Sequence, residues 1–200
     1  MKKLTLAGVS YDIRDIEGMI FLVPSRLRKF ERRIEADLKK SVTLLKKKGW
    51  YEYVLMADMI VVTVPSKRKG DFGEVFMATA ECPYPVYFSD SGMTASTSIH
   101  WVASVLVHEA MHVFQEYYLS LEALKDPRKQ EVDACREQKR FLRRCKRTSY
   151  ISHIDRQLKK GREWWKYLYE KPKTKRGRYC LKRDIYFDRV RDKLARHIPF

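Results

Sequence analysis

Two histidines and a glutamate stand within five residues of one another in the segment HEAMH, at His108, Glu109 and His112. The surrounding apolar run, residues 101–114, predicts a helix. Because the two histidines are at positions i and i+4, both imidazoles lie on one helical face and can reach a single metal ion. Glu109 projects close to them without being a ligand. Two neutral nitrogen ligands beside a carboxylate that can accept a proton from water are typical of a zinc hydrolase.

The helix that carries this segment should begin after several candidate N-caps between Thr94 and Ser98 and run to about Leu119. A second helix is predicted from Asp126-Pro127, an N-cap followed by proline at the first helical position. Further upstream, Ser25 is a plausible N-cap for a long amphipathic helix. Gly49 is a natural C-terminal stop for that helix.

A catalytic zinc site needs three protein ligands and a position left for water. In the metzincin pattern a glycine and a histidine would follow at the positions of Gln115 and Tyr118, so that pattern is excluded. The distal histidines, His153 and His197, do not have a persuasive spacing. Glu131 lies 19 residues after His112, early in the next predicted helix.

The string EVDA, from Glu131 to Ala134, follows the motif helix in a way that resembles the gluzincin clan of zinc metallopeptidases. These enzymes combine HExxH on one helix with a glutamate from an ExxA- or ExxxD-type segment on a following helix. Over about residues 25–147 the order of elements is similar to that of the compact minigluzincins. The resemblance implies that His108, His112 and Glu131 hold zinc and that Glu109 is the general base. Asp133 is the alternative ligand.

The chain departs from the gluzincin pattern at two places. Many gluzincins have an aspartate four residues after the ligand glutamate, where it orients the first histidine, but this chain has Cys135. The family also supplies a tyrosine or histidine that stabilises the oxyanion, and Tyr150 and His153 are the candidates in a suitable region. Residues 85–90, PVYFSD, are expected to form a short strand whose prolines suit an edge position. The resemblance further implies that this strand binds an extended peptide.

The pattern as a whole predicts an α+β fold. A small mixed sheet with an edge strand would pack on a long N-terminal helix, the HExxH active-site helix and the glutamate helix, followed by a helical basic C-terminal region. Strands are expected within residues 1–24, 51–64, 73–80 and 85–90. We expect a zincin-like catalytic domain at 1–147, with an N-terminal segment of uncertain role at 1–24, and a basic helical extension at 148–200.

Positive charge is concentrated at one end of the chain. The net charge is +17, and it divides into +2 for residues 1–120 (16 Lys+Arg, 14 Asp+Glu) and +15 for residues 121–200 (26 and 11). Such an excess suggests DNA or RNA as a partner, although a solvated helical face explains it equally well. The best candidates for phosphate contacts are the basic residues of a turn-like stretch, Lys173, Lys175, Arg176 and Arg178.

The composition also narrows the class of protein. No apolar stretch approaches the ~20 residues that span a bilayer, and no secretory signal is recognisable, so an intracellular, cytoplasmic protein of a cell, virus or mobile element is expected. Free thiols are expected at all four cysteines. The predicted function is a zinc metalloendopeptidase acting on a peptide or protein. The alternative is a basic nucleic-acid-binding protein whose HExxH site is structural or inactive.

Overall fold

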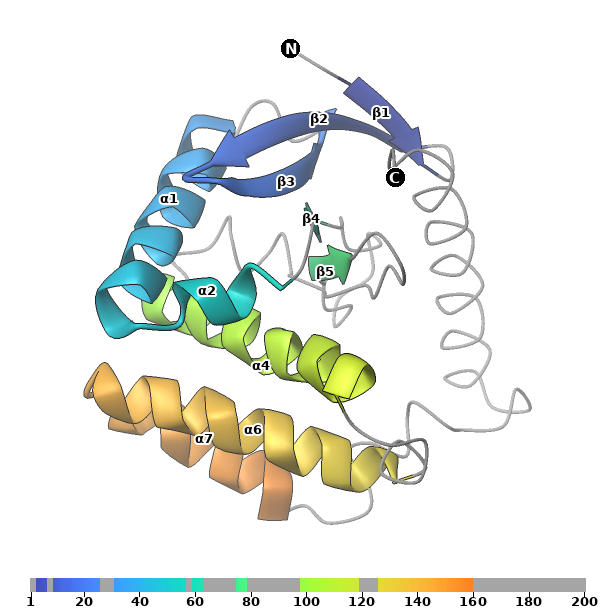
Figure 1. Ribbon diagram of the computed structural model, residues 1–200. Helices are drawn as coiled ribbons and strands as arrows, with labels where there is room; N and C mark the ends of the chain where they lie inside the picture. The colour runs from blue at the N-terminus through green and yellow to red at the C-terminus, as the bar shows by residue number, and fades with distance from the viewer. Residues whose placement is uncertain are drawn as a thin grey trace, which may run out of the picture.

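The structure, a computed structural model, describes residues 3–6, 9–25, 31–56, 59–62, 75–78, 98–118 and 126–159. The strands are β1 Lys3–Leu6, β2 Val9–Ile16, β3 Met19–Pro24, β4 Met59–Val62 and β5 Val75–Ala78. The helices are α1 Glu31–Lys48, α2 Tyr51–Val54, α4 Ile99–Tyr118, α6 Pro127–Arg144 and α7 Thr148–Lys159. This arrangement confirms the predicted α+β class (Figure 1).

Several predictions concern residues outside these ranges. They are the edge strand at 85–90, the part of the basic helical extension beyond residue 159, and the basic residues Lys173, Lys175, Arg176 and Arg178. The start of the first helix near Ser25 is also outside, because residues 26–30 are not described.

The five described strands form one mixed sheet in the order β1-β2-β3-β4-β5. Strands β3 and β4 pair in parallel, with Phe21 opposite Ile60, and the other neighbours pair antiparallel. The parallel pair follows from the chain between β3 and β4, because α1 and α2 carry it back to the start of the sheet before β4 begins. A small mixed sheet was the prediction.

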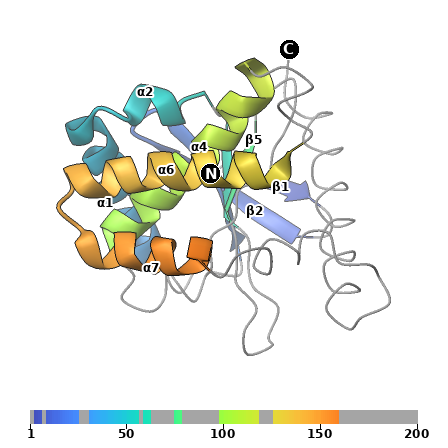
Figure 2. The same ribbon diagram turned by 90° about the horizontal axis from the view of Figure 1, so that it is seen from below.

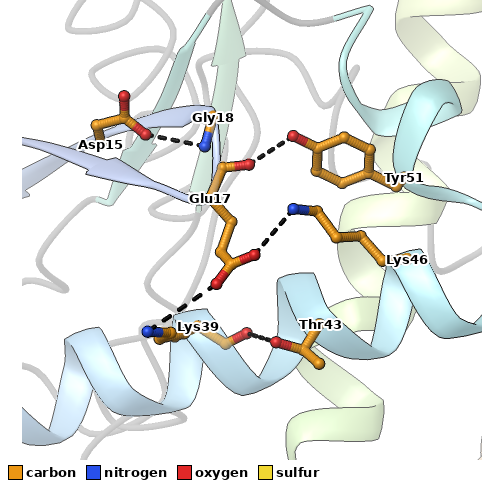
Figure 3. A network of polar contacts seen from close by, with 7 residues as sticks. All are labelled: Asp15, Glu17, Gly18, Lys39, Thr43, Lys46 and Tyr51. Carbon is orange, nitrogen blue, oxygen red and sulfur yellow. Dashed lines mark hydrogen bonds and ion pairs between the residues drawn. The ribbon is translucent and has the colours of Figure 1, made fainter.

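A tight turn joins β2 to β3 and attaches the sheet to α1 (Figure 3). Its central residues, Glu17 and Gly18, have φ angles of 59° and 88°, the left-handed pair of a type I′ hairpin turn. The Glu17 carboxylate is 2.8 Å from Lys46 Nζ and 3.9 Å from Lys39 Nζ, both on α1. The hydroxyl of Tyr51 donates to the Glu17 carbonyl. One two-residue turn therefore holds the hairpin against the helical layer.

Figure 1 shows α4 below β5, with α6 and α7 below α4, while α1 runs down one side from the level of β2 and β3. Helices α1 and α4 contact each other and the strands, α6 packs on α4, and α7 packs on α6. Seen from below, α6 and α7 lie side by side, and α6 crosses α4 (Figure 2). The predicted apolar stripe of α1 is buried at Leu38, Val42 and Leu45. Ile154 of α7 belongs to the same hydrophobic core.

The strand predicted at 51–64 is only half correct. Residues 59–62 form β4, but Tyr51–Val54 form the short helix α2. Two bonds that end α1, from Gly49 N to the Lys46 carbonyl and from Trp50 N to the Leu45 carbonyl, turn the chain back on itself. This turn buries Trp50 and Val54 in the core, and that packing outweighs the β-propensity of the tyrosines and valine.

Two further expectations concern the described residues. None of the described helices is both long and apolar enough to cross a bilayer. Cys135 and Cys145 are free thiols, as predicted.

Candidate metal centre

Helix α4 places the HEAMH segment where α4 meets α6. Its apolar side is fully buried at Leu106, Ala110 and Val113, which fixes the rotation of the helix. The side chains of His108, Glu109 and His112 keep 14%, 24% and 21% of their surface exposed. The motif therefore lies at the rim of the core, where polar side chains are partly shielded and an ion can still enter.

Helix α6 brings Glu131 to the histidines. The Asp126 side chain caps the helix by accepting a hydrogen bond from Lys129 N at 3.1 Å, and Pro127 occupies the first turn, as predicted. Glu131 then lies one turn further along, and Ala134 is fully buried. A small residue at that position allows the two helices to approach closely.

Both imidazoles direct Nε2 at the Glu131 carboxylate. His108 Nε2 is 3.5 Å from Oε2, and His112 Nε2 is 3.4 Å from Oε1. The two rings are 5.0 Å apart at an interplanar angle of 78°. Glu109 Oε1 lies 4.0 Å from His108 Nε2. Two nitrogens and two carboxylates thus converge from neighbouring helices.

This geometry could hold a metal ion. One ligand atom from each of His108, Glu109 and His112 lies within 4.8 Å of the others. Glu131 makes closer pairs with the histidines than Glu109 does, and it faces both. The donor set of imidazole nitrogen and carboxylate oxygen suits zinc and other divalent transition metals. The residues therefore fit a metal ion, and either Glu109 or Glu131 is close enough to the histidines to be its third ligand.

Gln115 orients the second histidine. Its Nε2 donates to the Gln130 carbonyl on α6 at 3.0 Å, so its Oε1 faces His112 Nδ1, 2.9 Å away. Because Oε1 only accepts, Nδ1 carries the proton, and the free lone pair of neutral His112 is on Nε2, toward Glu131. Sequence reasoning used Gln115 only to exclude the metzincins. The sequence signal was a polar glutamine three residues after the second motif histidine, and the structure shows that it is buried.

The first histidine lacks an equivalent partner. His108 Nδ1 is buried and has no hydrogen-bond partner among the described residues. Cys135, four residues after Glu131, is a buried neighbour close enough to raise the pKa of His108. Cys135 therefore affects the charge of His108, although it does not meet hydrogen-bond geometry at Nδ1.

Burial and mutual charge shift the pKa values of all four groups. Burial acts to lower the pKa of His108, but Glu109, Cys135 and Glu131 outweigh it and the pKa is well above its usual value. For His112 burial also lowers and Glu131 raises the pKa, with a net increase. Burial raises the pKa of Glu109 despite the two histidines. Burial acts to raise the pKa of Glu131, but the two histidines outweigh it and hold this pKa well below its usual range.

The remaining candidate residues lie elsewhere. Asp133, the alternative ligand, pairs with Arg136 on its own helix at 2.7 Å. Tyr150 and His153 gather around Trp101, with ring centroids 5.4 and 5.7 Å from it. Trp101 precedes the first motif histidine by about two turns, roughly 10 Å along α4. The structure thus groups Tyr150 and His153 with Trp101, and their oxyanion role stays a prediction.

Comparison of the chain with protein-family models, with curated proteins and with solved structures finds no match.

Proposed function

We propose that the chain is a zinc-dependent metallopeptidase of gluzincin type. The observation that supports this most directly is the convergence of His108 Nε2 and His112 Nε2 on one carboxylate of the next helix, with Glu109 beside them. The HExxH spacing places the histidines, and the α4–α6 packing supplies Glu131. A ferrous or structural zinc site would use similar donors, so metal identity and activity are tested together.

In this proposal His108, His112 and Glu131 hold the metal. Glu131 suits this role better than Glu109, because it faces both imidazoles from a separate helix and its low pKa keeps it ionised. Bound zinc would polarise the scissile carbonyl and lower the pKa of a bound water toward ~7. Gln115 holds His112 with Nε2 toward the ligand position.

Glu109 is the proposed general base. It lies 4.0 Å from His108 Nε2, so a water at the site is within reach of its carboxylate. Its raised pKa makes it a better proton acceptor than an exposed glutamate. Glu109 would take a proton from water and deliver it to the leaving amine, which regenerates the carboxylate.

Metal analysis and a peptidase assay on four variants test the proposal. Wild type and Glu109→Gln should each retain one zinc per chain, whereas His112→Ala and Glu131→Gln should lose it. Cleavage of a quenched fluorescent peptide library should require Glu109 as well. His100→Ala is the matched control, because His100 lies on the same helix but bonds to Ser98 and Arg147.

Each wrong outcome has a distinct meaning. A wild-type chain that carries no metal after purification would refute the metal centre. Loss of zinc in Glu109→Gln with retention in Glu131→Gln would exchange the two glutamates. A zinc-loaded chain without peptidase activity would favour the alternative, a structural or inactive site.

A further inference from the structure

The C-terminal ends of α1 and α6 meet in space, although 96 residues separate them in the chain. Lys48 Nζ donates to the Arg144 carbonyl at 3.1 Å, and Arg144 Nη1 donates to the Lys48 carbonyl at 3.5 Å. Figure 1 shows α1 descending toward the orange end of α6, where α7 also begins. Both helices therefore present their last basic turns on the same part of the surface.

Six cations gather at this meeting point, and we name them the basic cluster. They are Lys47, Lys48, Arg143, Arg144, Lys146 and Arg147. All are exposed except Lys48, which is half-buried. Among the described residues, no carboxylate forms an ion pair with any of them, whereas Arg136 and Arg140 on the same helix are each paired with one.

Two residues of the basic cluster, Lys48 and Arg147, act on the same histidine, His100. His100, whose Nε2 is 3.4 Å from Arg147 Nη2, has a pKa lowered first by burial and then by the charges of Arg147 and Lys48. The Arg144 guanidinium lies 5.6 Å from the centroid of the Trp50 ring. One basic residue from each helix end therefore acts on the same imidazole, and the cations form a single patch of positive potential.

Lys146 occupies a backbone position that favours glycine. Its φ is +56°, and the Lys146 and Arg147 amides donate to the Arg143 and Leu142 carbonyls in a Schellman motif. Helix α1 ends in the same motif with Gly49 at φ +75°. A lysine in this position is conformationally unfavourable and adds a sixth like charge, so neither backbone preference nor local electrostatics explains it.

We propose that the basic cluster binds the phosphodiester backbone of nucleic acid. Unpaired exposed lysines and arginines neutralise phosphates and release counterions, which gives sequence-independent binding. Trp50 is buried, and the cluster residues are all charged, so among the described residues this surface lacks the apolar anchors that a membrane-surface helix needs. Arg143 is about 18 Å along α6 from Glu131, so the surface is separate from the candidate metal centre.

A double variant, Arg143→Gln with Lys146→Gly, tests the proposal in the full chain. Binding to a labelled duplex DNA of about 20 base pairs, and to a single-stranded RNA of that length, is measured by anisotropy across a salt series. The slope of log Kd against log salt should become shallower by about 0.9 on DNA for each phosphate that the variant no longer neutralises, and Kd at 0.1 M should rise at least several-fold.

Arg32→Gln with Arg128→Gln is the matched control. It removes the same formal charge from exposed positions near the N-terminal ends of α1 and α6, away from the basic cluster, and its slope should change less. Glycine is favoured at the left-handed backbone position of Lys146, so Lys146→Gly alone should raise the Tm by about 1 to 3 °C. A loss of binding in the double variant would therefore not result from unfolding caused by this change.

The proposal is overturned if the two double variants have equal slopes on both probes, or if wild type shows no salt-dependent binding. It is also overturned if the cluster variant loses binding to phosphatidylserine vesicles while both nucleic-acid slopes are unchanged. The binding is expected to be the same in Glu109→Gln, because it does not depend on the peptidase proposal.

Discussion

Replacing Gln115 with leucine should weaken zinc binding without removing a metal ligand. Leucine is of similar size and keeps the site packed, but it cannot accept the proton of His112 Nδ1 or donate to the Gln130 carbonyl. Loss of a partner that orients a metal-binding histidine typically reduces metal affinity about 10- to 100-fold, equivalent to roughly 1.4 to 2.8 kcal/mol. The metal-free fold should lose about 1 to 3 kcal/mol, because two hydrogen bonds of a buried side chain are removed.

Gln138→Leu is a matched control for this change. Gln138 is also buried, and its Nε2 donates to Ser104 Oγ at 3.1 Å, so it too joins α6 to α4 by an amide hydrogen bond. Among the described residues, no hydrogen bond joins it to His108 or His112. Its replacement should destabilise the metal-free fold by about 1 kcal/mol and leave zinc affinity unchanged.

The assay is a competition titration of zinc against a chromophoric chelator, with urea unfolding in excess chelator as the measure of stability. Only Gln115→Leu should lose zinc affinity, whereas both variants should be less stable in urea. Wild-type zinc affinity in Gln115→Leu would show that the Gln115–His112 bond does not orient the ligand. An equal loss of affinity in Gln138→Leu would mean that general helix packing, and not this bond, controls the site.

Three more changes have expected outcomes. Cys135→Asp should raise zinc affinity about tenfold in the same titration, because a carboxylate there can accept the unused Nδ1 proton of the first motif histidine; unchanged affinity would exclude that contact. Gly18→Ala should destabilise the fold by roughly 1 to 3 kcal/mol in urea unfolding, and by more than Gly49→Ala. Both glycines have positive φ, but a Cβ at Gly18 would meet the Tyr51 hydroxyl at 2.8 Å, whereas nothing lies within 4 Å at Gly49, so equal losses would refute the clash. Burial, and then the charge of Glu137, raise the pKa of Tyr53, so its contribution to stability is complete below its ordinary pKa of about 10 and is lost as the pH rises further. Tyr53→Phe should therefore flatten the fall of Tm between about pH 9 and 11, and an unchanged profile would assign that fall to other groups.

Elements with a clear helical period were predictable. Helix α1 ends at the predicted Gly49, α4 covers the expected run, and α6 begins at the predicted Asp126 cap. In each case the signal is local, because an apolar stripe or a capping residue acts within a few turns of its own chain. The segment 51–54 was wrong, because its conformation depends on where the end of α1 directs Trp50.

The sequence by itself determined that His108 and His112 share one face of a helix, because the spacing of two residues on a helix is a property of the local backbone. It also limited the third ligand to a few distant residues. Only the tertiary structure decided which carboxylate faces the histidines, that Gln115 orients His112 while His108 Nδ1 lacks a partner, and that Lys48 meets Arg144. These contacts depend on how α4, α6 and α1 cross, and crossing is set by the packing of whole helical faces, which no short segment specifies.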